Sequence, residues 1–332
     1  MSPAEPALTD RFGRVATDLR ISVTDRCNFR CVYCLPAGGV EWLEKAKLLS
    51  FEEMARAARV FVSLGVTRIR LTGGEPTLRR NLPRLVAMLR EVDGDLDLAM
   101  TTNGFTLESL AQPLAAAGLN RINVSVDSLM AHKFHEITRR DALDQVMKGL
   151  SAAEEAGLGP VKLNCVVVRG TNDDEVLDFA RLARDTGWEV RFIEFMPLDA
   201  QRAWTRDRVV PASEIIQTIG RIFPLEPDVT GGEPARTWRF ADGVPGSVGV
   251  IASVTEPFCS SCDRLRLTAD GQLRTCLFST TESDLRALFR SGAPDEEISG
   301  VIRAAVRVKQ AGHLIDRPGF VQPARPMSSI GG

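Results

Sequence analysis

The fold of this chain is decided by residues 19–34, which read LRISVTDRCNFRCVYC. Residues 19–23 form a short run rich in apolar and β-branched residues, which is typical of a buried strand. The cysteines Cys27, Cys31 and Cys34 follow directly, with the spacing CxxxCxxC. If the strand belongs to a parallel sheet, the three thiols share a loop at the carboxyl edge of that sheet.

A regular alternation of apolar runs and amphipathic stretches continues from this strand. Runs typical of strands lie at residues 67–71, 96–101, 121–126, 161–168 and 190–196, and stretches typical of helices lie at 51–64, 82–92, 107–117, 143–156 and 175–186. Glycines follow several of the helical stretches, as residues that end helices do. Six successive βα units predict a parallel sheet, either doubly wound or curled toward a barrel. The functional site of such a sheet lies at the carboxyl ends of its strands.

The alternation stops near residue 225. Residues 226–236 are rich in Gly, Pro and charge, and the remainder reads as short strands and turns before a helix at 298–310. We therefore expect an α/β domain over residues 12–225 and a smaller α+β subdomain over residues 226–332.

The composition is that of an ordinary globular protein and excludes several classes. The chain has 332 residues, of which 44% are hydrophobic and 25% charged, and a formal net charge of −2. This balance excludes intrinsic disorder, and no apolar run reaches the roughly 18 residues of a membrane helix. A charge near zero argues against nucleic acid or an anionic membrane as a partner. The acidic, Pro-rich start lacks a signal-peptide pattern, so we expect a cytoplasmic protein whose cysteines are thiols, suited to metal or redox chemistry.

The first cysteine set is one ligand short of the four that structural zinc requires. A [4Fe–4S] cluster held by three cysteines instead leaves one iron open for a substrate or cofactor. With its CxxxCxxC loop at the end of the first strand of a βα series, the chain resembles the radical S-adenosylmethionine (SAM) enzymes. The resemblance implies that the open iron binds SAM and that an electron from the cluster cleaves SAM to a 5′-deoxyadenosyl radical.

Two further features match that family. Residues 73–76, GGEP, lie where the family binds the amino group of SAM, although a Gly-rich turn alone is weak support. Tyr33 is the only tyrosine of the chain and lies between the second and third cysteines, where the family has an aromatic residue near the adenine. An aromatic residue that packs in the core is the alternative interpretation of Tyr33.

A second set of cysteines, Cys259, Cys262 and Cys276, lies downstream. Residues 264–274 between them alternate and turn at Asp-Gly, so a hairpin returns the third cysteine toward the second. Two interpretations are equally open: a second cluster, or a zinc site with Cys165 as its fourth ligand. The sequence around Cys165 is that of a buried strand.

Arg264 and Arg266 lie two residues apart on the first strand of this hairpin, so they share one face. Two adjacent guanidinium groups suit an oligophosphate, because each donates in parallel to phosphate oxygens. A hairpin face exposed to solvent is the alternative.

Further segments narrow the resemblance to the branch of the radical SAM family that cyclises GTP in molybdenum cofactor synthesis. They are residues 18–28, 69–76, 123–128, 195–197, 259–266 and 330–332. The resemblance implies an incomplete (β/α)₆ barrel covered by a C-terminal α+β subdomain, two [4Fe–4S] clusters, SAM, and conversion of GTP to (8S)-3′,8-cyclo-7,8-dihydroguanosine 5′-triphosphate. It further implies a low-potential electron donor, a homodimer, and cyclic pyranopterin monophosphate synthase as the enzyme that accepts the product.

The same resemblance implies roles for individual residues. Cys27, Cys31 and Cys34 hold the first cluster, and Cys259, Cys262 and Cys276 hold the second, whose open iron binds the guanine. The SAM contacts are Tyr33, Gly74, Ser125 and Met196. The GTP contacts are Arg20, Arg70, Thr101, Lys162, Arg264 and Arg266. Gly331 and Gly332 form a terminal probe that reaches into the active site, against the alternative of a frayed tail.

Two other functions remain open from the sequence. A radical SAM peptide maturase with an auxiliary cluster needs a site for a leader peptide and commonly has more than the three cysteines found downstream here. A zinc or iron–sulfur module without catalytic activity is the alternative from a different class. Metal analysis separates the two classes, because an enzyme with two clusters holds about eight irons and a module one or two zinc ions.

Overall fold

The computed structural model describes residues 7–199, 202–228, 234–315 and 317–331. Its strands are β1 (Asp18–Ser22), β2 (Arg68–Thr72), β3 (Asp97–Thr102), β4 (Arg121–Ser125), β5 (Lys162–Val167), β6 (Glu189–Glu194), β7 (Leu225–Asp228), β8 (Arg236–Phe240), β9 (Ser247–Ile251), β10 (Arg264–Leu267), β11 (Gln272–Arg274) and β12 (Ser283–Asp284). Its helices are α1 (Phe51–Ser63), α2 (Leu82–Arg90), α3 (Leu107–Ala116), α4 (Ala131–Thr138), α5 (Leu143–Glu155), α6 (Val176–Thr186), α7 (Ala212–Gly220), α8 (Leu285–Ser291), α9 (Asp295–Arg307) and α10 (Met327–Ile330).

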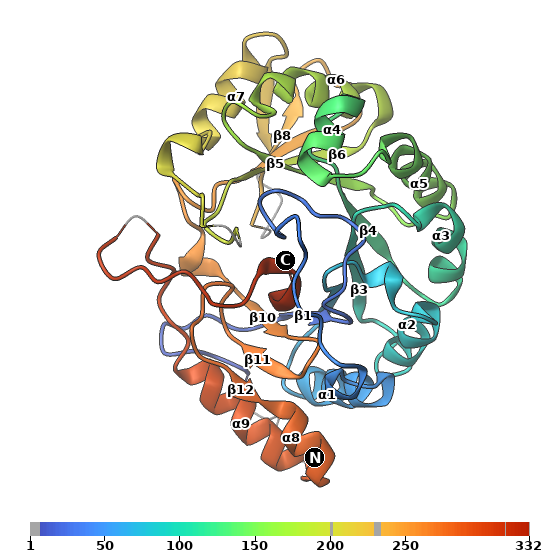
Figure 1. Ribbon diagram of the computed structural model, residues 1–332, viewed down its shortest axis with the longest axis vertical. Coiled ribbons are helices and arrows are strands. Elements are labelled where there is room, and N and C mark those ends of the chain that lie inside the picture. Colours follow the sequence, from blue (N-terminus) through green and yellow to red (C-terminus); the bar gives the residue numbers. More distant parts are fainter. Residues whose placement is uncertain (1–6, 200–201, 229–233, 316, 332) are drawn as a thin grey trace.

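All the strands belong to one curved sheet with the order β12-β11-β10-β1-β2-β3-β4-β5-β6-β9-β8-β7. Strands β1 to β6 are parallel and adjacent in chain order, and β10 and β9 extend them in parallel at the two ends. The sheet curls into a barrel that stays open on one side, and helices cover its outer face (Figure 1). The chain ends inside this ring, where α10 lies (Figure 1). The fold is therefore an incomplete (β/α)₆ barrel with further strands at both edges.

The barrel strands are apolar on the outside and polar on the inside. In β1, Leu19 and Ile21 are fully buried in the core between the sheet and the helices. The alternate residues, Arg20 and Ser22, point to the opposite face, into the barrel. The helices complement this pattern: α1 begins with a capping box between Ser50 and Glu53 and buries one apolar face.

The six predicted strands and the five predicted helices of the βα series are confirmed, as is the helix predicted at 298–310, which is α9. Of the two predicted arrangements, the barrel is correct, because the strands are adjacent in chain order. The sequence analysis missed the short helices α4, α7 and α8. These helices have only 8, 9 and 7 residues, too few turns for an apolar period to stand out. The strands after residue 225 all join the barrel sheet, and the division of the chain at that point stays a prediction.

Among the described residues, no helix is both long and apolar enough to cross a membrane.

A buried carboxylate ties the last barrel strand to the segments that follow it. Glu194 ends β6 and is fully buried. It accepts hydrogen bonds from the backbone N–H groups of Ala212 (3.0 Å), Val254 (2.7 Å) and Thr255 (2.8 Å). These donors belong to the start of α7 and to the segment after β9, so one side chain satisfies three buried donors from two distant parts of the chain.

Replacing Glu194 should therefore destabilise the whole protein. Glu194→Ala leaves three buried N–H groups without an acceptor, and each costs about 1–3 kcal/mol. We expect the melting temperature to fall by more than about 5 °C in anaerobic calorimetry. The control is Glu214→Ala, which removes an exposed ion pair with Arg169 worth at most about 1 kcal/mol. Equal shifts in the two variants would contradict this role.

Candidate active site

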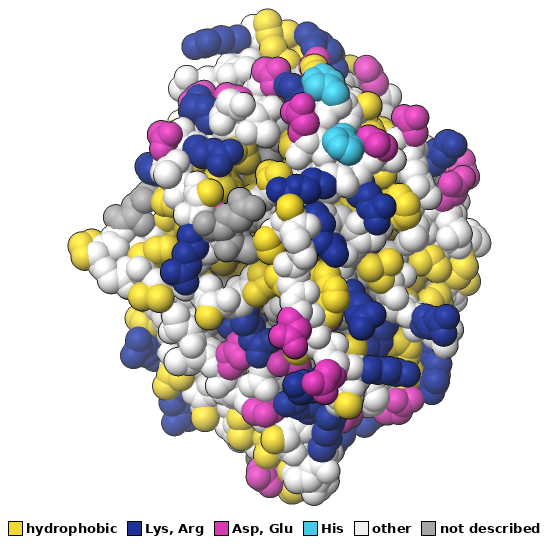
Figure 2. All heavy atoms as spheres, viewed as in Figure 1, with side chains coloured by type: hydrophobic (Ala, Val, Ile, Leu, Met, Phe, Trp, Pro, Cys, Tyr) yellow, Lys and Arg dark blue, Asp and Glu magenta, His cyan; other side chains and the backbone are white. Residues whose placement is uncertain are grey.

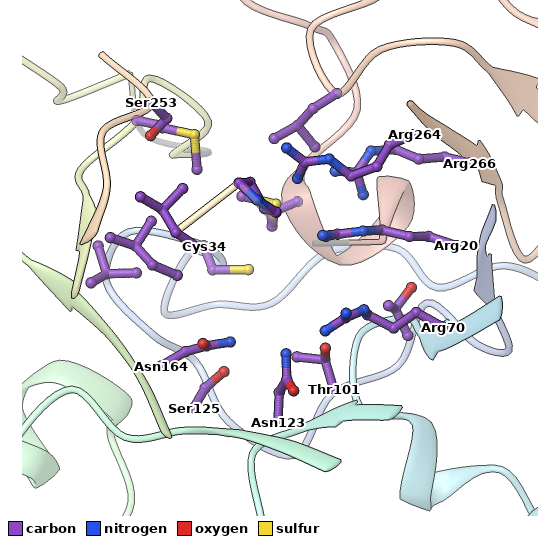
Figure 3. Close-up of a pocket in the computed structure, with 18 of the residues that line it drawn as sticks. Arg20, Cys34, Arg70, Thr101, Asn123, Ser125, Asn164, Ser253, Arg264 and Arg266 are labelled. Atoms are coloured by element: carbon purple, nitrogen blue, oxygen red, sulfur yellow. The ribbon is translucent and has the colours of Figure 1, made fainter. Parts of the chain in front are cut away.

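A cavity of about 320 Å³ lies inside the barrel and is lined by both cysteine sets. Most of the expected site residues line it: Arg20, Cys27, Cys31, Tyr33, Cys34, Arg70, Gly74, Thr101, Ser125, Met196, Cys259, Cys262, Arg264, Arg266 and Cys276. The arginines and the strand residues point toward one centre (Figure 3). Lys162 and Gly331 are described but are not part of this lining, and Gly332 lies outside the described residues.

The thiols of the first set are close enough to influence one another. Burial raises the pKa of the Cys31 thiol well above its usual value, and the negative charges of Asp127, Cys34 and Cys27 raise it further. Burial also raises the pKa of Cys27 to about 11 and that of Cys34 to about 12. Three buried thiols with high pKa values become thiolates readily only when a bound cation compensates their charge.

These thiols fit an iron–sulfur cluster. In the described part of the chain, no three Cys, His, Asp or Glu side chains converge as the ligands of a single metal ion do. Ligands of a [4Fe–4S] cluster bind different irons, which suits thiols spread along a loop. The backbone N–H of Phe29 donates to the sulfur of Cys27 at 3.4 Å, a hydrogen bond of the kind that tunes such clusters.

The loop after β2 packs backbone to backbone against the cysteine loop. The N–H of Gly74 donates to the carbonyl of Thr24 (2.9 Å), and the N–H of Glu75 donates to that of Arg26 (2.7 Å). A Cβ on Gly74 would lie 2.4 Å from the carbonyl oxygens of Asp25 and Arg26, a separation that atoms do not adopt. Only glycine fits at this position.

The carboxylate of Glu75 joins this loop to the next strand. It is buried and accepts hydrogen bonds from the hydroxyls of Thr77 and Thr102 (both 2.6 Å) and from the N–H of Asn103 (2.7 Å). The carboxyl ends of β2 and β3 are thereby fixed beside the cysteine loop.

Tyr33 has a polar partner within the cavity wall. Its hydroxyl donates to the carboxylate of Asp127, which follows β4 and is buried. The other oxygen of Asp127 accepts from the N–H of Val166 at 2.8 Å. The ring of Tyr33 is therefore held in a fixed position at the edge of the cavity, between the cysteine loop and β5.

The second cysteine set is surrounded by hydrogen-bond donors and cations. The N–H of Phe278 donates to the sulfur of Cys276 at 3.4 Å. Although burial raises the pKa of the Cys262 thiol, the positive charges of Arg264 and Lys309 lower it, and the net effect is a lower value than usual. Gly312 packs on Cys259, because a Cβ at that position would lie 2.9 Å from the Cβ of the cysteine.

Two buried cations hold the backbone of this second set. Lys309 donates through Nζ to the carbonyls of Cys262 (2.8 Å) and Arg264 (3.0 Å). Arg14 donates to the carbonyl of Cys259 (2.6 Å) and is paired with Asp10. The CxxC turn is thus fixed from the C-terminal end of α9 and from the N-terminal segment.

The proposal of zinc with Cys165 as a fourth ligand is wrong. Cys165 is buried in the apolar core and does not line the cavity. Its neighbours on β5, Asn164 and Val166, do line the cavity, and successive residues of a strand point to opposite faces. The expectation that Cys165 is a buried strand residue is confirmed.

Parallel strand pairing aligns three arginines inside the barrel. Arg20 on β1 lies in register with Arg266 on β10 and with Arg70 on β2, and Arg264 shares the face of Arg266. All four side chains point to the same space (Figure 3). The predicted hairpin is confirmed by the antiparallel pairing of β10 with β11. Its arginines face the cavity, so the alternative of a solvent-exposed face is wrong.

The arginines repel one another electrostatically. Burial lowers the pKa of Arg20 well below its usual value, and the charges of Arg266, Arg264 and Arg70 lower it further, with Asp18 opposing. The Nε of Arg20 is buried and has no hydrogen-bond partner among the described atoms. This concentration of guanidinium groups suits a polyanion of the size of an oligophosphate.

Lys162 occupies a different position from these arginines. It is at the start of β5, two residues before the cavity-lining Asn164, and its Nζ lies 3.2 Å from the carboxylate of Glu189. Its side chain is 9% exposed, which fits the expectation that it is not a surface lysine. Its contact with a substrate stays a prediction.

The C-terminal segment enters the barrel and touches both halves of the site. Arg325 anchors it through an ion pair with Asp270, in the turn of the β10–β11 hairpin (2.9 Å). The backbone of Ser328 lies close enough to Cys34 to lower the pKa of its thiol, opposing the effect of burial, and Arg266 donates to the carbonyl of Gly331. The described residues of this segment therefore do not form a solvent-exposed tail.

Gly331 itself tolerates no side chain. Its φ is +83°, and a Cβ would lie 2.3 Å from Oγ of Ser22 and 2.6 Å from Oγ1 of Thr72. These hydroxyls belong to the ends of β1 and β2, so the terminal backbone lies against the barrel wall.

The sequence assigned no role to three side chains that shape the site: Asp127, Lys309 and Arg14. Asp127 directly follows a predicted strand, and its place at the carboxyl end of that strand was the only indication in the sequence that it belongs to the site. Lys309 and Arg14 belong to segments without any motif, and their role follows from tertiary contacts alone.

Family models match nearly the whole chain. Residues 21–183 match the model of the Radical SAM superfamily, and residues 188–315 match that of Molybdenum Cofactor Synthesis C. Among solved structures, that of Streptococcus suis SuiB bound to S-adenosylmethionine superposes with a TM-score of 0.64 at 12% identity, covering 94% of this chain and 77% of that one. Methylornithine synthase (PylB) gives a TM-score of 0.51 at 16% identity, covering 64% and 63%. These identities are so low that the likeness shows the fold alone.

The fold, the cysteine loop and the family models define a radical SAM enzyme, which holds a [4Fe–4S] cluster and SAM. The chain is 51% identical to the GTP 3′,8-cyclase of Mycolicibacterium smegmatis, covering 100% of this chain and 93% of that one. It is 52% identical to the GTP 3′,8-cyclase of Streptomyces coelicolor, covering 98% and 96%. The chain therefore belongs to the GTP 3′,8-cyclase family.

The close fit of Gly74 gives a steric prediction. In Gly74→Ala, the new methyl group displaces the loop from the cysteine loop, and we expect the affinity for SAM to fall at least about tenfold, or ~1.4 kcal/mol. Equilibrium dialysis of the reconstituted enzyme with labelled SAM measures this. In the matched control, Gly38→Ala, the methyl group meets nothing within 4 Å. Unchanged SAM binding by Gly74→Ala would overturn the steric argument.

Proposed function

We propose that this chain cyclises GTP to (8S)-3′,8-cyclo-7,8-dihydroguanosine 5′-triphosphate, the first step of molybdenum cofactor synthesis. The observation that carries the proposal is one cavity in which a cysteine set at the SAM-binding end faces aligned arginines and a second cysteine set. Family membership supports the same reaction.

The first cysteine set and the loops around it are assigned to SAM. Cys27, Cys31 and Cys34 would hold a [4Fe–4S] cluster, which would supply the electron that cleaves SAM for removal of the 3′ hydrogen of GTP. The chain holds SAM through Gly74, Ser125, Tyr33 and Met196. The Tyr33–Asp127 hydrogen bond supports this assignment, because it fixes the ring at the cavity edge.

The opposite end of the cavity is assigned to GTP. Arg20, Arg70, Arg264 and Arg266 bind the triphosphate, and the mutual repulsion of their charges supports this role. Thr101 and Lys162 complete the substrate contacts. Cys259, Cys262 and Cys276 would hold a second [4Fe–4S] cluster, whose open iron would bind the guanine. The buried cations Lys309 and Arg14 behind that set support this assignment.

Anchoring both ends of the substrate serves the chemistry. The carbon radical on the ribose must react with the guanine ring before it reacts with any other group, so the reacting atoms need a fixed geometry. Holding the base and the triphosphate separately restricts the ribose between them, and an enclosed cavity excludes water and competing donors of hydrogen.

The proposal also covers the compartment, the oligomeric state and the partner proteins of the enzyme. It acts in the reducing cytoplasm, which suits cysteines that form no disulfides among the described residues. It works as a homodimer, receives electrons from a low-potential donor and passes its product to cyclic pyranopterin monophosphate synthase.

Anaerobic incubation with SAM, GTP and dithionite tests the reaction. We expect 5′-deoxyadenosine and the cyclised nucleotide to form together, with about eight irons per chain. SAM cleavage without any nucleotide product in the fully loaded enzyme would contradict GTP as the substrate.

The two cysteine sets should fail in different ways. Cys31→Ala should abolish SAM cleavage while the second set keeps about half of the iron. Cys276→Ala should keep slow, uncoupled formation of 5′-deoxyadenosine and lose the cyclised product. Iron analysis with both product assays measures this, and equal loss of SAM cleavage in the two variants would refute the division of roles.

The terminal glycines should couple SAM cleavage to GTP cyclisation. Removing Gly331 and Gly332 deletes the carbonyl that Arg266 holds, and we expect the yield of cyclised product per 5′-deoxyadenosine to fall at least about tenfold, because the guanidinium and the cavity wall lose a fixed neighbour. Single-turnover assays measure the ratio.

A matched control keeps the tail in place. Ser329→Ala alters a half-buried residue of the same segment and should leave the ratio unchanged. A truncated chain with the ratio of the intact enzyme would mean that the terminus has no role in the reaction.

A further inference from the structure

Arginines surround the outer side of the first cysteine loop. Arg30 donates to the carbonyls of Cys27 (2.6 Å) and Phe29 (2.8 Å). Arg139 donates to the carbonyl of Arg30 (2.8 Å), and Arg140 donates to that of Asn28 (2.9 Å). Arg26, directly before the first cysteine, is exposed. We name Arg26, Arg30, Arg139 and Arg140 the arginine collar.

None of the collar arginines forms an ion pair among the described residues. Several other surface arginines are matched with carboxylates, as in Arg184–Asp242 and Arg290–Glu53. The hydrogen-bond acceptors of Arg30, Arg139 and Arg140 are neutral carbonyl oxygens. Arg30 also lies over the ring of Trp42, and none of these contacts cancels a positive charge. Of the acidic residues nearest in sequence, Asp25 is buried and accepts from the N–H of Leu43. Glu136 and Asp141 are exposed, so the four arginines outnumber these two carboxylates.

The collar is exposed in part and lies next to α4. Arg26 and Arg140 are exposed, and Arg30 and Arg139 are half-buried. Basic side chains gather near the middle of the face that Figure 2 shows, and the loop after β1 passes beside α4 in Figure 1. The four like charges come from two segments that meet at the cysteine loop, and they repel one another. A negatively charged partner therefore stabilises this surface.

We propose that the arginine collar is the docking surface for an acidic electron-carrier protein that reduces the first cluster. This inference rests on the proposed function and specifies how electrons enter. Arg30 contacts the backbone of Cys27 itself, and none of the four collar arginines lines the cavity. A carrier seated on the collar therefore lies beside the cluster ligands without entering the cavity. In each docking event the carrier is oxidised by one electron and the cluster is reduced by one.

The charge pattern favours a small acidic protein over a nucleic acid. The whole chain has a formal net charge of −2, and a polyanion that spans many phosphates needs a longer basic surface than four side chains. An acidic protein with a patch of similar size would associate faster with the collar, because electrostatic attraction steers the two surfaces together.

Stopped-flow reduction of the cluster tests the proposal. The enzyme with both clusters loaded is mixed anaerobically with reduced flavodoxin, an acidic carrier, or with reduced methyl viologen, a small cation. The variant Arg26→Glu/Arg140→Glu reverses the two exposed collar charges. The matched control Arg59→Glu reverses an exposed arginine on α1 that is without an ion pair among the described residues.

We expect the double variant to react with flavodoxin at least about tenfold more slowly than the intact enzyme, with a weaker dependence on salt. The rate of its reduction by methyl viologen should stay within about twofold of that of the intact enzyme, because basic residues do not attract a cationic reagent. Arg59→Glu should match the intact enzyme with both reductants.

Two results would overturn the docking role. One is a flavodoxin rate in the double variant equal to that of Arg59→Glu. The other is an equal decrease in the rate of reduction by methyl viologen, which would mean that the collar charges affect reduction of the cluster by any donor. GTP cyclisation by the intact enzyme with methyl viologen tests the proposed function separately, so the failure of one proposal is distinguishable from that of the other.

Discussion

The register between β10, β1 and β2 is the constraint on which the rest of the site depends. It aligns Arg266, Arg20 and Arg70 in one row inside a barrel. Burial and the neighbouring positive charges lower the pKa values of Arg20 and Arg266 there. A barrel interior filled with apolar side chains is the usual solution. This barrel instead keeps its apolar residues on the outer face, under the helices, so the interior stays polar and hollow. A bound polyanion would offset the unfavourable placement of the arginines, which supports the proposal that the cavity binds a triphosphate.

The two ends of the chain complete a site that the barrel alone leaves open. β10 carries two of the arginines and joins the sheet next to β1, although hundreds of residues separate the two strands. Arg14 near the N-terminus supports the second cysteine set, and the C-terminal segment lies against the first set and Arg266. A substrate between the two sets therefore contacts groups from both ends and from the middle of the sequence.

Most of the fold and much of the cavity wall were predictable, because local signals and motifs mark them. The six strands follow from apolar runs, and the cysteine loops from their spacing. The inward orientation of Arg264 and Arg266 was not predictable, since a register change of one residue reverses it. The short helices α4, α7 and α8 lack a readable period, and the roles of Lys309 and Asp127 depend on contacts between distant segments. Lys162 matched the motif of the family, yet its ion pair with Glu189 sets it apart from the cavity lining.

The central claim is that one cavity brings the ribose of GTP to the radical formed from SAM. The most direct measurement uses GTP carrying deuterium at C3′ in an anaerobic single turnover, with mass analysis of the 5′-deoxyadenosine. The account predicts that the 5′-deoxyadenosine contains one deuterium and that the cyclised nucleotide has lost it. Unlabelled 5′-deoxyadenosine, formed at the same rate with and without GTP, would contradict the account.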